Sequence, residues 1–315
     1  MQSPGDLSSA NPAWAARERA AEAAANRGFA AAVVAYLFWG VFPLYLRPLI
    51  GIPPLQIIAH RVVWSSVLVL ALLAARGELK KLRAALSEPA LCARLVLTAT
   101  LISVNWLTYV WGVSHGRVVE TSLGYFINPL VSVLLGIMVL HERLDRVQWA
   151  AVALAACGVA VLSVASRGIP WIALVLAVSF GLYGLLRKMM RVDALPGLGA
   201  ETLLLAPLAL AYLITCEARS SGAFGHESRI LDVLLIGGGP VTAVPLFLFA
   251  YGARRIPYST IGLLQYLSPT LQLACGVFVF GEPFAGVRAT GFALIWLALI
   301  VFAGHGLHRS RRGRS

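Results

Sequence analysis

Ten long apolar stretches, each close to the length that crosses a lipid bilayer, dominate this chain of 315 residues. About 20 apolar residues make one helical span. Here 59% of all residues are apolar and 13% are charged, with a mean hydropathy of +0.79, more apolar surface than a soluble fold of this size can bury. Because lipid offers no hydrogen-bond partners, each stretch must satisfy its own backbone as a helix. We predict an all-α integral membrane protein with ten transmembrane helices, at 28–46, 55–75, 93–114, 119–140, 147–166, 169–187, 198–216, 230–251, 259–281 and 286–305.

The second half of the chain repeats the first half about 140 residues later. Leu123–Glu142 aligns with Leu263–Glu282, which places Asn128-Pro129 on Ser268-Pro269. Each repeat holds five spans, an odd number, so the second copy must be inverted in the membrane. We predict a cytoplasmic N-terminal segment at 1–27, five-helix repeats at 28–166 and 169–305, and a basic cytoplasmic tail at 306–315. We also expect residues 13–26 to form a short helix on the membrane surface.

The net charge of +12 is distributed unevenly between the two sides of the predicted membrane. Of the 26 Lys and Arg residues, 19 fall on the side of the N-terminus, 6 on the opposite side and Arg61 within a span. Basic loops stay in the cytoplasm, so both termini are predicted to lie there, in a multi-pass protein of the cytoplasmic (inner) cell membrane. The basic tail then contacts anionic lipid, and no nucleic-acid partner is expected.

Ionisable residues inside predicted spans are the first candidates for function, because each is costly in lipid unless a partner or water meets it. Arg61 lies about 10 Å into the second span, and Glu201 lies at a comparable depth in the seventh. One interpretation is that Arg61 attracts an anionic group while Glu201 or His60 carries a proton. The alternative is a structural ion pair between Arg61 and Glu201.

Two prolines fall at equivalent positions of the repeats and are predicted to break helices. Pro129 and Pro269 each remove one backbone hydrogen bond and loosen the helix four residues earlier, at Tyr125 and Gln265. The broken helices are predicted to act as gates. The polar faces beside them fit either a cavity lining or a close helix seam. Further candidates for solute binding are polar or aromatic residues near mid-span: Trp39, Asn105, Trp106, Asn128 and Tyr266.

The sequence lacks the patterns of several other function classes. It contains no phosphate-binding GK[ST] motif, no HExxH zinc motif and no Ser-His-Asp set. Its four cysteines are scattered without CxxC spacing, so neither a metal nor a cofactor is expected. Two rivals stay open: a membrane-embedded enzyme acting on a lipid-like substrate, with His60 and Glu201 as acid and base, and a facilitative channel.

Several segments resemble a known family. The sequence is similar to the RarD proteins of the EamA division of the drug/metabolite transporter superfamily, over essentially residues 28–305. The similarity is carried by the string from Glu120 to Leu130, ETSLGYFINPL, with the HRVVWS segment at 60–65, HER at 141–143 and QYLSPT at 265–270. The motif residues carried over are His60, Arg61, Asn105, Trp106, Gly124, Tyr125, Asn128, Pro129, Glu201, Gln265, Tyr266 and Pro269.

The resemblance implies an exporter-like permease. Together with the residue pattern it predicts a secondary, alternating-access transporter, and not an enzyme, for a small organic solute. The sequence leaves open the solute, the direction, the coupling to protons and the oligomeric state, for which a homodimer is one option.

Reporter fusions test the topology. Fusions after Ser87 and after Ser310 are expected to report the cytoplasm, and a fusion near Ser221 the outside, because the basic loops stay inside. Any other pattern contradicts the odd number of spans in each repeat, and with it the inverted arrangement.

Overall fold

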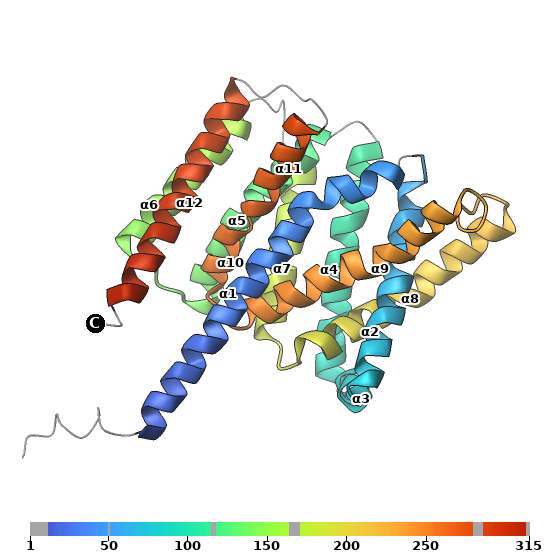
Figure 1. Cartoon of the computed structure of the whole chain (residues 1–315), viewed down its shortest axis with the longest axis horizontal. Helices are drawn as coiled ribbons and strands as arrows, with labels where there is room; N and C mark the ends of the chain where they lie inside the picture. The colour runs from blue at the N-terminus through green and yellow to red at the C-terminus, as the bar shows by residue number, and fades with distance from the viewer. Residues whose placement is uncertain (1–11, 50, 115–117, 164–170, 280–285, 313–315) are drawn as a thin grey trace, which may run out of the picture.

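The computed structural model describes residues 12–49, 51–114, 118–163, 171–279 and 286–312, and every regular element in these ranges is a helix (Figure 1). The elements are α1 (Pro12–Leu46), the short 3₁₀ helix η1 (Arg47–Leu49), α2 (Pro54–Ala75), α3 (Leu79–Ser87), α4 (Pro89–Ser114), α5 (Val118–Leu140), α6 (Arg146–Ser163), α7 (Trp171–Met189), α8 (Ala194–Ala218), α9 (Arg229–Ala253), α10 (Tyr258–Leu264), α11 (Leu267–Phe278) and α12 (Val287–Arg312).

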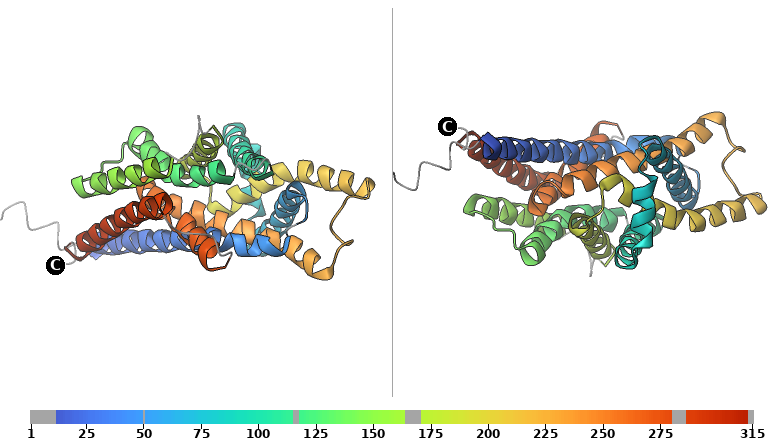
Figure 2. Two further views of the ribbon diagram at one scale, coloured as in Figure 1. Left: turned by 90° about the horizontal axis from the view of Figure 1, so that it is seen from above. Right: turned by 90° about the horizontal axis from the view of Figure 1, so that it is seen from below.

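The long helices form two layers, seen edge-on in Figure 2. One layer contains α4, α5, α6 and α7, and the other contains α1, α9, α10 with α11, and α12. Helices α2 and α8 pack on each other at one edge, whereas α6 packs on α12 at the opposite edge. Each layer therefore mixes elements from both halves of the chain, because α1 lies among the later helices and α7 among the earlier ones.

Seven of the described helices are long and apolar enough to cross a bilayer: those at 16–49, 54–75, 89–112, 146–163, 171–189, 194–218 and 229–253. Shorter apolar helical segments occupy Gly124–Leu140 and Ala289–Phe302. The pair α10 and α11 falls short because a break divides it. The structure thus confirms a helical membrane protein, while the count of ten spans stays a prediction.

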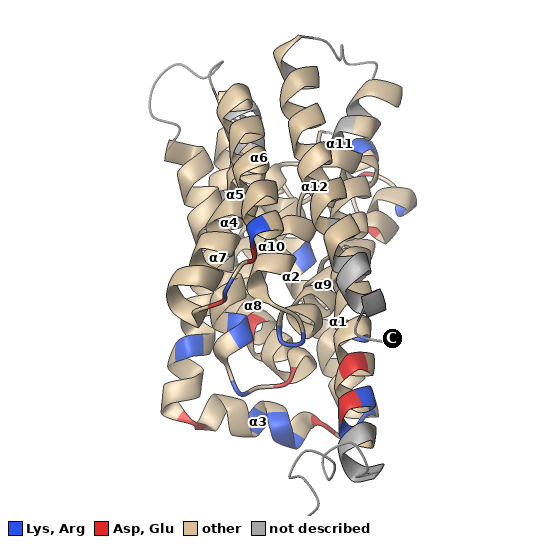
Figure 3. Cartoon of the chain, turned by 90° about the vertical axis from the view of Figure 1, so that its left-hand side faces the viewer, with Lys and Arg blue, Asp and Glu red and all other residues tan. Residues whose placement is uncertain are grey.

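Charged residues gather at one end of the bundle, around α3 and the first turns of α1 (Figure 3). We call this the α3 end and the opposite one the far end. Lys81 on α3 pairs with Glu78 at 3.0 Å and with Asp193 at 3.3 Å, and the hydrogen bonds that it donates to these carboxylates raise the pKa of Lys81 above its usual value. These pairs are exposed, so they hold α3 to the start of α8 only weakly.

The N-terminal helix corrects one expectation. Residues 13–26 do not form a separate surface helix, because α1 runs unbroken from Pro12 to Leu46. The segment is rich in alanine, the strongest helix former, and the first glycine of α1, Gly28, lies against Arg255, where the helix continues. At 1.5 Å per residue α1 is about 50 Å long, more than the roughly 30 Å of a hydrocarbon core, so its first part projects beyond the other helices.

The basic tail corrects a second boundary. The predicted tail at 306–315 begins inside α12, which continues to Arg312; residues 313–315 lie outside the described ranges. The predicted boundary between the repeats, near residues 166–169, also falls outside them, as does Glu282.

The two prolines differ in their effect. The helix around Pro269 is divided, since α10 ends at Leu264 and α11 begins at Leu267, with Gln265 between them as predicted. The prediction of a break at Tyr125 is wrong, because α5 is continuous with Pro129 inside it. Close packing explains the difference: α5 is held against α7, where Gly124 lies against Ala173 and Leu176.

Glycines bring α2 and α9 into close contact near the middle of the bundle. A side-chain carbon on Gly239 would lie 2.6 Å from the backbone of Trp64, and one on Gly238 would lie 2.9 Å from Arg61. Ser65 donates a hydrogen bond to the carbonyl of Gly239 at 3.1 Å. The small residues of α9 therefore position Arg61 by letting its helix approach.

Candidate functional site

Arg61 is held by three helices at once. Its Nε donates a hydrogen bond to Thr242 Oγ1 on α9 at 2.7 Å. Its guanidinium carbon lies 4.8 Å from the ring centre of Phe42 on α1 and 5.0 Å from that of Trp106 on α4. Aromatic faces attract cations most strongly where water is excluded. The predicted residues Arg61 and Trp106 are therefore in direct contact.

Tyrosines surround the same guanidinium. The hydroxyl groups of Tyr45, Tyr109 and Tyr125 lie within electrostatic range of Arg61. The rings of Tyr109 and Tyr125 also contact each other, with centres 5.9 Å apart. Tyr125, predicted to bind solute, thus belongs to the surroundings of Arg61. A cation framed by hydroxyl groups and aromatic faces can bind an anionic group together with an apolar one.

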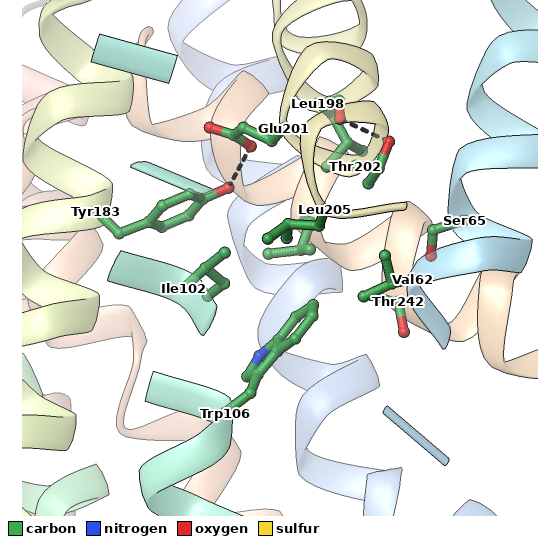
Figure 4. A pocket seen from close by; sticks show the side chains of 11 residues that line it. Val62, Ser65, Ile102, Trp106, Tyr183, Leu198, Glu201, Thr202, Leu205 and Thr242 are labelled. Carbon is green, nitrogen blue, oxygen red and sulfur yellow. Dashed lines mark hydrogen bonds between the residues drawn. The ribbon is translucent and has the colours of Figure 1, made fainter. Parts of the chain in front are cut away.

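A small cavity lies beside this group (Figure 4). This central cavity is lined from α2 by Val62 and Ser65, from α4 by Ile102 and Trp106, and from α7, α8 and α9 by Tyr183, Glu201, Leu205 and Thr242 among others. Its volume is about 10 Å³, which holds about one water molecule. A solute fits only after the lining helices move apart.

Glu201 lies on the opposite wall of the central cavity, where its carboxylate is fully partnered. Thr98 donates to its Oε1 at 2.6 Å and Tyr183 to its Oε2 at 3.3 Å, while Arg187 Nη1 lies 3.7 Å from Oε1. Only 3% of Glu201 and 1% of Arg187 is exposed. The predicted ion pair between Arg61 and Glu201 is wrong, because Glu201 faces α4 and α7 and finds its cation on α7.

Arg187 was not among the predicted site residues. Its Nη2 donates to the carbonyl of Ala194 at 3.0 Å, and its guanidinium lies directly over Gly197, where any side chain would displace it. Its Nε is buried without a hydrogen-bond partner among the described groups. The only sequence signal was the cation pair Arg187-Lys188 at the end of a span, which is equally typical of a cytoplasmic loop.

Other predicted residues serve helix packing. Asn105 Nδ2 donates to the carbonyl of Leu176 at 2.9 Å and to Ser179 Oγ at 3.0 Å, joining α4 to α7. Trp39 lies in an aromatic cluster, 5.6 Å from Phe180 and 5.8 Å from Phe249. The structure does not bring these two residues into contact with Arg61.

His60 is separated from the central cavity. It neighbours Arg61 on α2, but its ring packs against Phe224 in the connection between α8 and α9, with centres 5.3 Å apart. No hydrogen bond joins it to Glu201 within the described chain.

The crossing of α5 and α10 gathers the remaining candidates. The carbonyl of Pro129 faces Gly262, whose lack of a side chain permits the close approach. Tyr266 donates its hydroxyl hydrogen to the carbonyl of Phe126 at 3.2 Å. Asn128 Oδ1 and Gln265 Oε1 are buried without a hydrogen-bond partner among the described groups. A buried acceptor without a donor costs about 1–3 kcal/mol, and this cost marks both amides as candidates for contact with solute.

The turn between α9 and α10 is held by two charged side chains. Glu142, just after α5, accepts hydrogen bonds from the backbone amides of Tyr258 at 2.6 Å and Ser259 at 2.8 Å. Lys188 donates to the carbonyls of Ala253 at 3.0 Å and Ile256 at 2.6 Å. A carboxylate suits a helix start and an ammonium a helix end, so Glu142 and Lys188 fix the start of α10. The HER segment carried only part of the family resemblance in the sequence, and it did not predict this role of Glu142.

No metal site is found in the described ranges, where no three His, Cys, Asp or Glu side chains gather. The four cysteines are free thiols.

Comparison with known proteins identifies the family. The profile of the EamA-like transporter family matches the chain twice, over residues 26–164 and 167–304. The chain belongs to the EamA-like transporter family. It is a membrane transporter of the drug/metabolite type and resembles the RarD permeases within that family.

Individual relatives extend over nearly the whole chain. An uncharacterized transporter of Pseudomonas aeruginosa is 45% identical over 281 residues, covering 88% of this chain and 93% of the relative. A RarD protein of Streptomyces exfoliatus is 44% identical over 284 residues, covering 89% of each chain. One solved crystal structure superposes with a TM-score of 0.69 at 20% identity, covering 89% of this chain and 96% of that one. This last likeness concerns the fold alone.

The partner of Glu201 can be tested by stability. Arg187→Met leaves a buried carboxylate without its cation and is expected to lower the free energy of unfolding by about 3–5 kcal/mol. Adding Glu201→Gln is expected to restore most of the loss, because both charges are then removed. Thermal unfolding of the purified protein measures the effect. Arg61→Met is the matched control: rescue of Arg61→Met, but not of Arg187→Met, by Glu201→Gln contradicts the pairing.

Proposed function

We propose that the protein is a secondary carrier that moves a small organic solute across the cytoplasmic membrane by alternating access. The repeats at 28–166 and 169–305 would surround one central site in opposite orientations, with both termini in the cytoplasm. The two matches of the family profile fall on nearly the same ranges and support this division.

The packing pattern supports a two-fold relation between the halves. Exchanging α1, α2, α4, α5 and α6 with α7, α8, α9, the α10–α11 pair and α12 maps the pattern onto itself. Helix α1 packs on α9 and α11, as α7 packs on α4 and α5. In three packed pairs each helix is the counterpart of the other, as expected for helices on either side of a two-fold axis: α2 with α8, α5 with α10, and α6 with α12. Small relative rotations about such an axis would expose the centre to each side in turn.

The proposed function rests mainly on the position of Arg61. A cation about 10 Å inside a span is costly, and here its partners are neutral: one hydroxyl group and two aromatic faces. These partners come from α1, α4 and α9, so they belong to both proposed repeats. No carboxylate among the described residues pairs with Arg61, and such a guanidinium at the seam of two halves suits an anionic group on the solute, with Trp106 and Tyr125 beside its apolar part.

Glu201 is the proposed coupling group. Its carboxylate lines the same cavity as Thr242, the hydroxyl partner of Arg61, and it is held by Arg187 on the other side. Proton uptake by Glu201 would weaken its attraction for Arg187 and free α7 and α8 to separate. His60 is less suited, because its ring packs against Phe224. Proton coupling predicts that Glu201→Gln abolishes the pH dependence of transport, whereas exchange or facilitated flux, the alternatives, predict that it leaves this dependence unchanged.

Arg61→Lys tests the binding role. Lysine keeps the charge but loses the planar fork of donors, so the variant is expected to fold and to bind weakly. A panel of organic anions and their neutral analogues is screened by thermal shift. Anions that stabilise the wild type should lose about tenfold or more in apparent affinity in Arg61→Lys and in Arg61→Ala, a loss of about 1.4 kcal/mol. Equal stabilisation of all three proteins would show that Arg61 does not bind the solute.

Alternating access can be tested with single cysteines at Asn128 and Ser268, in a protein lacking the four native cysteines. The two positions are equivalent in the repeats, so a bound solute should protect one of them from an impermeant thiol reagent added outside. The other should then become more reactive from the cytoplasm. A channel would instead keep both positions accessible together, and lack of reaction at both would mean that the α5–α10 crossing is a packed seam.

A further inference from the structure

A hollow much larger than the central cavity lies at the far end, between α2, α4, α7 and α8. We call it the outer pocket. Its volume is about 570 Å³, within the range of pockets that bind small molecules. It is lined in part by Leu55 on α2, Thr108 and Val110 on α4, and Tyr212 on α8. Helix α8 approaches α4 near Glu201 through Thr98, and the pocket opens where the two helices no longer touch.

The outer pocket continues the central cavity along the same helix faces. Seven residues separate Leu55 from Val62 on α2 and Leu205 from Tyr212 on α8, and four separate Trp106 from Val110 on α4. Spacings of four and seven return to the same side of a helix. Helices α2 and α8 therefore line both spaces with one face, whereas α4 turns Val110 and also its neighbouring faces, with Leu107 and Trp111, to the outer pocket, which begins about 6–10 Å farther along.

The lining of the outer pocket selects for uncharged groups. None of the described residues that line it is charged, and among them only Thr108 and Tyr212 carry side-chain hydroxyl groups. Trp111 and Trp171 form an aromatic wall, with ring centres 5.3 Å apart and planes inclined by 50°. Aromatic walls favour flat rings, which pack on them edge-to-face or offset. By contrast, Glu201 lines the central cavity, and Arg61 lies beside it through its hydrogen bond to Thr242.

We propose that the outer pocket is a second binding site in series with the central one, and that it holds the uncharged aromatic part of the solute at the far end. The proposal rests on the carrier function and names its substrate class: an amphipathic molecule with an aromatic ring and, at its other end, a polar or anionic group for Arg61. The ring binds where α4 and α8 diverge, and the polar group enters the central cavity when the helices part.

The test measures binding without transport. In full-length protein lacking the four native cysteines and held in lipid nanodiscs, Thr108→Cys is labelled with N-phenylmaleimide and N-methylmaleimide, which are both uncharged. The control is Val41→Cys, a lipid-exposed position a similar number of residues from the end of α1. The phenyl-to-methyl rate ratio at position 108 should exceed the ratio at position 41 about tenfold. The labelling rate at position 108 alone should saturate with N-phenylmaleimide.

A filling variant provides the second arm. Val110→Trp occupies the outer pocket and should reduce the ratio at position 108 to that of the control, whereas Leu97→Trp, on an exposed part of α4, should leave it unchanged. Equal ratios and linear rates at positions 108 and 41 overturn the proposal. A phospholipid retained in native mass spectra of the wild type but lost in Val110→Trp also overturns it, because the occupant is then lipid. Saturable labelling without alternating reactivity at Asn128 and Ser268 upholds the site and refutes the carrier.

Discussion

A guanidinium inside a bilayer must find its partners in the protein around it, and this requirement determines the packing at the centre of the structure. Two arginines satisfy the requirement in different ways. Arg187 is paired with Glu201 and anchored to a backbone carbonyl, so its charge is balanced inside the fold. Arg61 has a hydroxyl group and aromatic faces as partners, which stabilise a cation without neutralising it. The first arrangement is typical of structural pairs, and the second leaves net positive charge for something else to meet.

Close helix contacts make both arrangements possible. Gly238 and Gly239 let α2 approach α9 until Arg61 reaches Thr242, and Gly197 leaves the volume that the guanidinium of Arg187 fills. Helix association in membranes depends on such small residues, because lipid supplies no hydrophobic drive between helices. The glycines therefore determine where the charged groups can lie, although they carry no chemistry themselves.

The helices themselves were predictable, because in lipid an apolar stretch of sufficient length has one stable form. The predicted spans 55–75 and 230–251 agree with α2 and α9 to within two residues at each end. Arg61 and Trp106 were predicted as separate candidates within spans, but their contact was not predicted. The partner of Glu201 was not foreseen, because it depends on how α7 and α8 rotate about their axes. Depth in the membrane, which the sequence does give, fits Arg61 as a partner of Glu201 equally well. The amphipathic helix α3 and the continuous helix through Pro129 were missed for a related reason: surface packing and neighbouring helices decide them, not local pattern.

The clamped turn before α10 has a mechanical consequence. Glu142 and Lys188 fasten the start of α10 to the first half of the chain and to α7, while the helix is interrupted at Gln265, one turn or two later. Helix α11 thus has its pivot at the interruption, and its 12 residues tilt together with α1, because Ser268 and Gln272 donate hydrogen bonds to carbonyls of that helix. At 1.5 Å per residue α11 is about 18 Å long, so a tilt of about 10° moves its tip by about 3 Å. Glu142 and Lys188 lie outside the surroundings of Arg61, yet they fix the end of the α10–α11 pair that is held in place.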